Sequence, residues 1–170
     1  LDMVKYLCGD VAWVEGELAS GTVREMDGLP DPGASAVMGF SSGARGFGAA
    51  DGMDWRRHRF EVDVWGGEGR IRMWDDGRAA GLWRYQASRH NEGYLELPSE
   101  QESLPPWASR ERMVAMIEEA LDVLEKAGPS RSTGGDGVAA LELAFAIHAS
   151  AQRGGARVEL PLKDRRWRWT

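Results

Sequence analysis

The histidines are the first candidates for chemistry, because an imidazole can act as a general base or as a metal ligand. The chain has three, at positions 58, 90 and 148. His148 falls in a predicted buried helix and His90 in a polar turn, whereas His58 opens a predicted strand beside Arg56. No histidine pair has a metal-ligand spacing, and no motif suggests a serine nucleophile with its base. Of the three histidines, we therefore expect only His58 near a site.

The glycine-rich segment 39–48 is the next candidate, because such loops can cradle phosphates. Its spacing is neither that of a dinucleotide-binding fingerprint nor that of a P-loop. The alternation of residues around it favours a β-hairpin that turns at 41–43. Residue by residue, the sequence predicts no metal site, no cofactor-binding loop and no complete set of catalytic residues.

The hydrophobic periodicity predicts strands first and helices late. Alternating segments predict strands over 12–18, 34–41, 44–50, 58–65, 70–75, 79–86, 93–97 and 158–160, with a loop over 21–33. Apolar residues at helical spacing predict helices over 110–127 and 137–153, with Ser109 and Asp136 as N-caps. This order, with hairpin-length links, predicts one α+β domain over 1–170. Its sheet is open and mostly antiparallel, with helices packed on one face.

The predicted sheet has one apolar face and one face that mixes charges with indoles. The apolar face, which the helices should cover, carries Val14, Phe60, Val62, Val64, Ile71 and Met73. Large aromatic side chains on the uncovered face of a sheet usually meet another protein surface. We therefore expect a homo-oligomer interface on that face, formed by Trp13, Trp65, Trp74, Arg59, Glu61, Asp63 and Arg72.

Length, charge and cysteine content exclude several classes of protein. A chain of 170 residues can bury one core without covalent staples. The net charge of −6 argues against a nucleic acid as the main partner. Cys8 is the only cysteine, so no internal disulfide can form, and a cytoplasmic protein is expected. No apolar run approaches the roughly 18 residues of a membrane span.

The first ten residues predict the last turns of an amphipathic helix. Leu1, Val4, Leu7 and Cys8 share one face, and Gly9 provides the stop. A helix this short is marginal alone. We therefore expect a further domain upstream of residue 1.

The order of several motifs along the chain is distinctive. They are L-D-M-V-K-Y-L-C-G at 1–9, W-V-E-G at 13–16, G-F-S-S-G-A-R-G at 39–46, E-V-D-V-W-G-G-E-G-R-I-R-M at 61–73 and L-E-L-A-F-A-I-H-A-S-A-Q-R-G-G-A-R-V-E-L-P-L at 141–162. In this order they resemble the C-terminal domain of the Gfo/Idh/MocA oxidoreductases, the family of glucose-fructose oxidoreductase and inositol dehydrogenase. The resemblance implies a fold like the C-terminal domain of glyceraldehyde-3-phosphate dehydrogenase.

The resemblance also implies that cofactor binding and substrate binding belong to different domains. In this family an N-terminal Rossmann domain binds NAD or NADP and holds the catalytic lysine, and a catalytic histidine precedes the aspartate that Asp2 matches. This chain would then hold no catalytic and no cofactor-binding residue. Asp2, Arg56 and His58 would touch a sugar, a polyol or a related substrate.

Two other functions remain open from the sequence. A sheet that dimerises through its tryptophan face could be an interaction module without enzymatic activity. Exposed tryptophans could also serve as stacking platforms in a carbohydrate-binding module.

Overall fold

A computed structural model describes residues 1–19, 24–26, 29–31, 33–50, 60–104, 112–126 and 128–163. The chain divides into two compact units, of which one comprises 1–55 and 128–170 and the other comprises 56–127. Each unit has its own antiparallel sheet, so the chain is α+β, as the sequence predicts.

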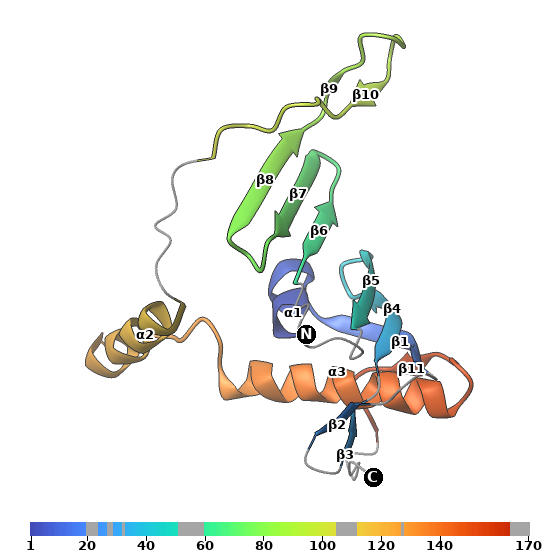
Figure 1. Ribbon diagram of the computed structural model, residues 1–170, viewed down its shortest axis with the longest axis vertical. Coiled ribbons are helices and arrows are strands. Elements are labelled where there is room, and N and C mark those ends of the chain that lie inside the picture. The colour runs from blue at the N-terminus through green and yellow to red at the C-terminus, as the bar shows by residue number, and fades with distance from the viewer. Residues whose placement is uncertain are drawn as a thin grey trace. The chain divides into compact units, whose positions relative to one another are not determined.

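The first unit is built on a four-stranded sheet (Figure 1). Its strands lie in the order β11 (Val158–Glu159), β1 (Val11–Leu18), β4 (Ala34–Phe40) and β5 (Arg45–Ala50), and every neighbouring pair is antiparallel. The same unit contains two helices, α1 (Asp2–Cys8) and α3 (Gly134–Gln152). The predicted hairpin that turns at 41–43 is confirmed.

A short ladder of β2 (Arg24–Met26) and β3 (Leu29–Asp31) lies within the segment for which the sequence predicted a loop. That prediction was wrong because strands of three residues are too short for apolar and polar positions to show a period of two.

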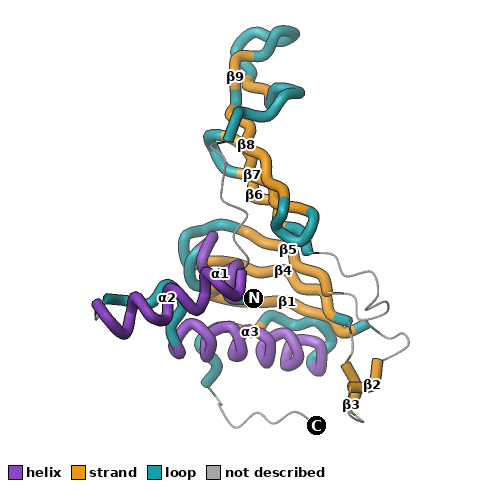
Figure 2. The backbone as a smooth tube through the Cα atoms, turned by 60° about the vertical axis from the view of Figure 1, so that its left-hand side comes forward, coloured by secondary structure: helices purple, strands orange, loops and turns teal. Residues whose placement is uncertain are grey.

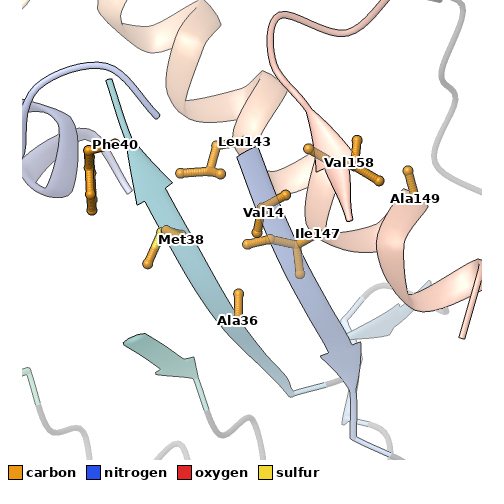
Figure 3. Packing of buried hydrophobic residues seen from close by; sticks show 9 residues of the cluster. Val14, Ala36, Met38, Phe40, Leu143, Ile147, Ala149 and Val158 are labelled. Carbon is orange, nitrogen blue, oxygen red and sulfur yellow. The ribbon is translucent and has the colours of Figure 1, made fainter. Parts of the chain in front are cut away.

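Helix α3 covers one face of the four-stranded sheet (Figure 2). Strands β1 and β4 turn alternate residues toward the helix, and α3 meets them with an apolar side (Figure 3). The buried cluster consists of Val14, Ala36, Met38, Phe40, Leu143, Ala146, Ile147, Ala149 and Val158. The core is therefore the strand-helix contact that the alternation around Val14 predicted.

Ser150 is the buried polar residue at the centre of this contact, with no exposed surface. Its hydroxyl accepts the N–H of Gly16 at 2.8 Å and donates to the carbonyl of Ala156 at 2.7 Å. Strand β11 pairs with β1 only at 13 and 14. Beyond this short ladder, the Ser150 hydroxyl connects the two segments through its bonds to Gly16 and Ala156. Gly16 leaves room for the helix, because a Cβ there would lie 2.9 Å from the Ile147 side chain.

The start of α3 differs from the prediction. The helix begins at Gly134 with Thr133 as its N-cap, and Asp136 is the third helical residue of a capping box. The Asp136 carboxylate accepts the backbone N–H of Thr133 at 2.9 Å, while the Thr133 hydroxyl accepts the N–H of Asp136 at 3.3 Å. The glycines at 134, 135 and 137 have low helix propensity. For this reason the sequence did not predict that the first turn of the helix includes them.

The second unit contains a three-stranded antiparallel sheet of β6 (Val62–Trp65), β7 (Gly69–Trp74) and β8 (Ala79–Arg84), in that order. The predicted strand 58–65 begins only at Val62 within the described residues. The predicted strand 79–86 breaks at Tyr85, whose N–H turns to the carbonyl of Glu68. The chain then forms a ladder of β9 (Gln86–Ala87) and β10 (Leu95–Glu96).

Helix α2 (Arg112–Lys126) matches the predicted helix 110–127 within the described residues. Its predicted N-cap, Ser109, lies outside them. Its apolar stripe stays more than half exposed at Met113, Met116, Ile117, Leu121 and Leu124. The expectation that helices cover a sheet face is thus met by α3, whereas the stripe of α2 remains accessible.

We predict that Ser150→Ala lowers the free energy of unfolding by about 1–3 kcal/mol, because the buried N–H of Gly16 loses its acceptor. Equilibrium unfolding in urea measures this loss. Ser42→Ala is the matched control, since the Ser42 hydroxyl bonds an exposed carbonyl at 3.3 Å. A loss at Ser150 no larger than the roughly 0.5 kcal/mol usual for surface changes would contradict the prediction.

Candidate functional site

Asp2 lies in the first turn of α1, and its carboxylate accepts a hydrogen bond from the Ser132 hydroxyl at 3.2 Å. The side chain is exposed. The carboxylate therefore keeps lone pairs that a ligand hydroxyl could reach.

Lys5 ties α1 to the start of α3. Its ammonium group lies 3.0 Å from the carboxylate of Asp136 and 3.7 Å from that of Asp10. The side-chain and backbone hydrogen bonds of Thr133, followed by that of Lys5, hold the pKa of Asp136 well below its usual range. The hydrogen bond that Lys5 donates to Asp136 raises the pKa of Lys5. Because each group favours the charged state of the other, the pair is ionised at neutral pH.

A cleft of about 330 Å³ opens beside this network. Helices α1 and α3, the start of β1 and the segment after β11 surround it. Its lining consists of Leu1, Lys5, Asp10, Val11, Ala12, Ser41, Ala139, Ala140, Glu142, Leu143, Leu160 and Pro161. A largely apolar wall with a few convergent polar groups is typical of a small-molecule site.

The polar groups of the cleft suit a hydroxylated ligand. Asp10 offers carboxylate oxygens, Ser41 offers a hydroxyl and Lys5 offers N–H donors. Glu142 also lines the cleft, and its carboxylate accepts the N–H of Leu162 at 2.9 Å. The described residues contain no cluster of three side chains that could hold a metal ion. The arrangement can bind and orient polar groups by hydrogen bonds.

The face of the four-stranded sheet opposite α3 carries a stacked tryptophan. The Trp13 indole lies across Gly39, where a Cβ would collide with the ring. The guanidinium groups of Arg45 and Arg157 lie 4.5 and 3.8 Å from the ring centroid, within cation–π range. Arg157 also pairs with Glu15 at 3.0 Å.

One face of the three-stranded sheet carries a ladder of arginines and indoles. Arg70 bonds Asp63 at 2.8 Å and lies 4.6 Å from the Trp65 centroid and 5.4 Å from that of Trp83. The hydrogen bond from Arg70 lowers the pKa of Asp63. A second row adds Arg72, 3.1 Å from Glu61 and 5.9 Å from the Trp74 centroid.

The strand register brings together the expected interface residues Glu61, Asp63, Trp65, Arg72 and Trp74, all in the second unit. Trp13 belongs to the first unit. Arg56, His58 and Arg59 lie outside the described residues, so their predicted roles stay predictions.

Sequence reasoning missed several residues of these clusters. Trp83 could have been found, because the 75–78 turn places it opposite Arg70. Lys5 and Asp136 gave no local signal, since 131 positions separate them.

Comparisons with known proteins identify the fold. No protein-family model and no curated protein matches this chain. Among solved structures, the aldose-aldose oxidoreductase from Caulobacter crescentus, complexed with glycerol, is similar at a TM-score of 0.69 and 16% identity. The alignment covers 94% of this chain and 44% of that one.

Two further solved structures agree. The WlbA dehydrogenase from Bordetella pertussis, in complex with NADH and UDP-GlcNAcA, has a TM-score of 0.64 at 19% identity, over 95% of this chain and 42% of its own. An NAD binding oxidoreductase from Klebsiella pneumoniae has a TM-score of 0.65 at 16% identity, over 96% and 48%. The chain thus spans less than half the length of these proteins and has the fold of one of their domains, as the resemblance implied.

We predict that Asp136→Asn loosens α1 at neutral pH, because the charge that holds Lys5 is lost. Hydrogen exchange of the α1 amides should become faster in this variant than in the wild type. Asp122→Asn, which removes an exposed partner of Lys126 at 2.9 Å, is the matched control and should leave α1 unchanged.

The same network sets a pH dependence. Since the folded state lowers the pKa of Asp136, its contribution is present above the ordinary aspartate pKa and is lost as the pH falls below about 4. Exchange of α1 in wild type and Asp136→Asn, corrected for intrinsic rates, should therefore converge in acid. Equal protection of α1 in both proteins at neutral pH would refute the role of this ion pair.

Proposed function

We propose that this chain is the substrate-wall and oligomerisation domain of an NAD(P)-dependent oxidoreductase of the Gfo/Idh/MocA type, acting on a sugar, a polyol or a related compound. The observation that carries the proposal is the coverage. Nearly the whole chain aligns with oxidoreductases, while it spans less than half of each. A hydride-transfer enzyme divided in this way needs a second domain for its dinucleotide.

The dinucleotide does not fit the residues of this chain. No G-x-G-x-x-G fingerprint follows a strand and opens a helix here. The part of this domain in the reaction is therefore to bind and orient substrate. Asp2 and Asp10 accept hydrogen bonds from substrate hydroxyls, Lys5 donates hydrogen bonds to substrate oxygens, and the apolar wall excludes water from one side.

The ligands of the solved neighbours support a hydroxylated substrate. One neighbour holds glycerol and another holds UDP-GlcNAcA with NADH. The volume of the cleft, about 330 Å³, lies at the lower end of small-molecule pockets and suits a compound of the size of a monosaccharide.

The uncovered sheet faces support the oligomerisation role over a carbohydrate-binding module. A sugar platform needs an indole ring that is free to stack. The rings of Trp13 and Trp65 already carry guanidinium groups. Mixed charges beside indoles suit a partly polar contact between protein surfaces.

We predict that the purified 170-residue chain reduces neither NAD nor NADP with any sugar or polyol, whereas the whole protein that contains it does. The reason is that hydride acceptor and catalytic base both lie outside this domain. Absorbance at the nicotinamide band measures the reaction. Turnover by the isolated chain, or a whole protein that lacks a dinucleotide-binding domain, would contradict the proposed function.

We also predict that Asp2→Asn in the whole enzyme lowers kcat/KM by roughly ten- to a hundredfold, the worth of a hydrogen bond to a charged group. Ser132→Ala is the matched control, because it removes the same structural bond and leaves the carboxylate. If Ser132→Ala reproduces the whole loss, Asp2 acts on structure and does not bind substrate.

For the oligomer, we predict that Trp65→Glu weakens self-association of the chain, because a 60% exposed indole is replaced by a charge. Light scattering across a concentration series measures the change. Ile71→Glu is the control, since Ile71 is 52% exposed on the other face of the same sheet. A Trp65→Glu variant that associates as well as wild type would exclude this face.

A further inference from the structure

Helix α3 carries a second apolar row, on the side that does not face the sheet. Val138, Leu141 and Phe145 follow one another at spacings of three and four, so they lie in one line along the helix, the outer row. Val138 is 62% and Leu141 is 56% exposed, whereas the opposite side of the helix belongs to the core. A helix that is apolar on both sides is normally covered on both. Val138 and Leu141 therefore offer a surface to a further segment of protein.

The chain that leaves α3 returns along this helix toward its first turn. Near the end of the helix, the Ser150 hydroxyl donates to the carbonyl of Ala156 at 2.7 Å. Six residues later, the N–H of Leu162 reaches the carboxylate of Glu142 at 2.9 Å. In an α-helix, position 142 is flanked by position 138, four residues before it, and by position 145, three residues after it. Leu162 thus lies beside the outer row.

The next residues of the sequence have the composition and length of a cover for this row. Residues 164–170, the tail, lie outside the part of the chain that the structure describes, and their sequence is D-R-R-W-R-W-T. Trp167 and Trp169 are two positions apart, so an extended tail would direct both indoles to one side. Seven extended residues reach about 25 Å, whereas the row from Val138 to Phe145 is only about 10 Å long. The tail is long enough to cross the whole row.

Charge favours the same contact. Helix α3 contains two carboxylates, Asp136 and Glu142, and neither lysine nor arginine. Segment 163–170 contains four basic residues and one aspartate. Since Asp136 already pairs with Lys5, Glu142 is the carboxylate of α3 that the basic tail would meet first. Opposite charges on the two segments favour their association and help to fix its register.

We propose that residues 164–170 form a strap across the outer row of α3, with the indoles of Trp167 and Trp169 against Val138 and Leu141. The occupant is the tail of this same chain, because the preceding residues deliver it to the row and because its length, its indoles and its charge all match. The strap continues directly from Leu160 and Pro161, which line the cleft. It depends neither on the proposed substrate nor on the proposed oligomer.

Thiol labelling of the 170-residue chain tests the strap. In a Cys8→Ala background, Leu141→Cys places a single thiol in the outer row, and the rate of its reaction with N-ethylmaleimide measures how well the row is covered. Replacing both Trp167 and Trp169 by alanine should speed this reaction about fivefold or more, because the cover is lost. Replacing both by phenylalanine should leave the reaction slow, since a phenyl ring also covers apolar surface.

Gln152→Cys in the same background is the matched control. Position 152 is exposed on the same side of α3, three turns or about 16 Å beyond Leu141, and its labelling should not respond to the tail. An unchanged rate at Leu141→Cys after loss of both indoles overturns the strap, and so does an equal rise at both positions. Protection that depends on protein concentration and not on the indoles assigns the row to a second copy and also overturns the strap.

Discussion

Helix α3 can bury only one face of the four-stranded sheet, and most features of the first unit depend on that limit. The face it covers holds the core around Val14, where Ser150 provides the hydrogen bonds that the short β11 cannot. The face it leaves open must present side chains to water or to a partner. There the guanidinium groups of Arg45 and Arg157 lie against the Trp13 ring, outside the core.

The N-terminal end of the same helix holds α1 in place. A helix of seven residues cannot persist alone, so it depends on its neighbours. Val4 and Cys8 lie against the core, and Lys5 reaches the capping box of α3 through Asp136. One carboxylate thus caps α3 and anchors α1. The cleft lies beside this contact between α1 and α3, so its shape depends on the ion pair of Lys5 and Asp136.

Local patterns in the sequence predicted much of this fold. The period of two assigned Val14 to the core and Trp13 to the open face, and it placed Asp63, Trp65 and Arg72 together. The sequence patterns did not predict the short β2–β3 ladder or the glycine-rich first turn of α3. The cleft escaped as well, because it joins residues near 1–12, 41, 139–143 and 160–161. Contacts between segments so far apart are set by packing and leave no trace in local periodicity.

We propose that this domain forms one wall of a substrate site that another domain completes. Hydrogen exchange of the whole protein tests it most directly, with and without NAD and with a panel of aldoses and polyols. We expect one member of the panel to slow exchange in α1 and in 10–12, and to do so more strongly when the dinucleotide is bound. If the dinucleotide and the whole panel leave exchange in both segments unchanged, the claim is contradicted.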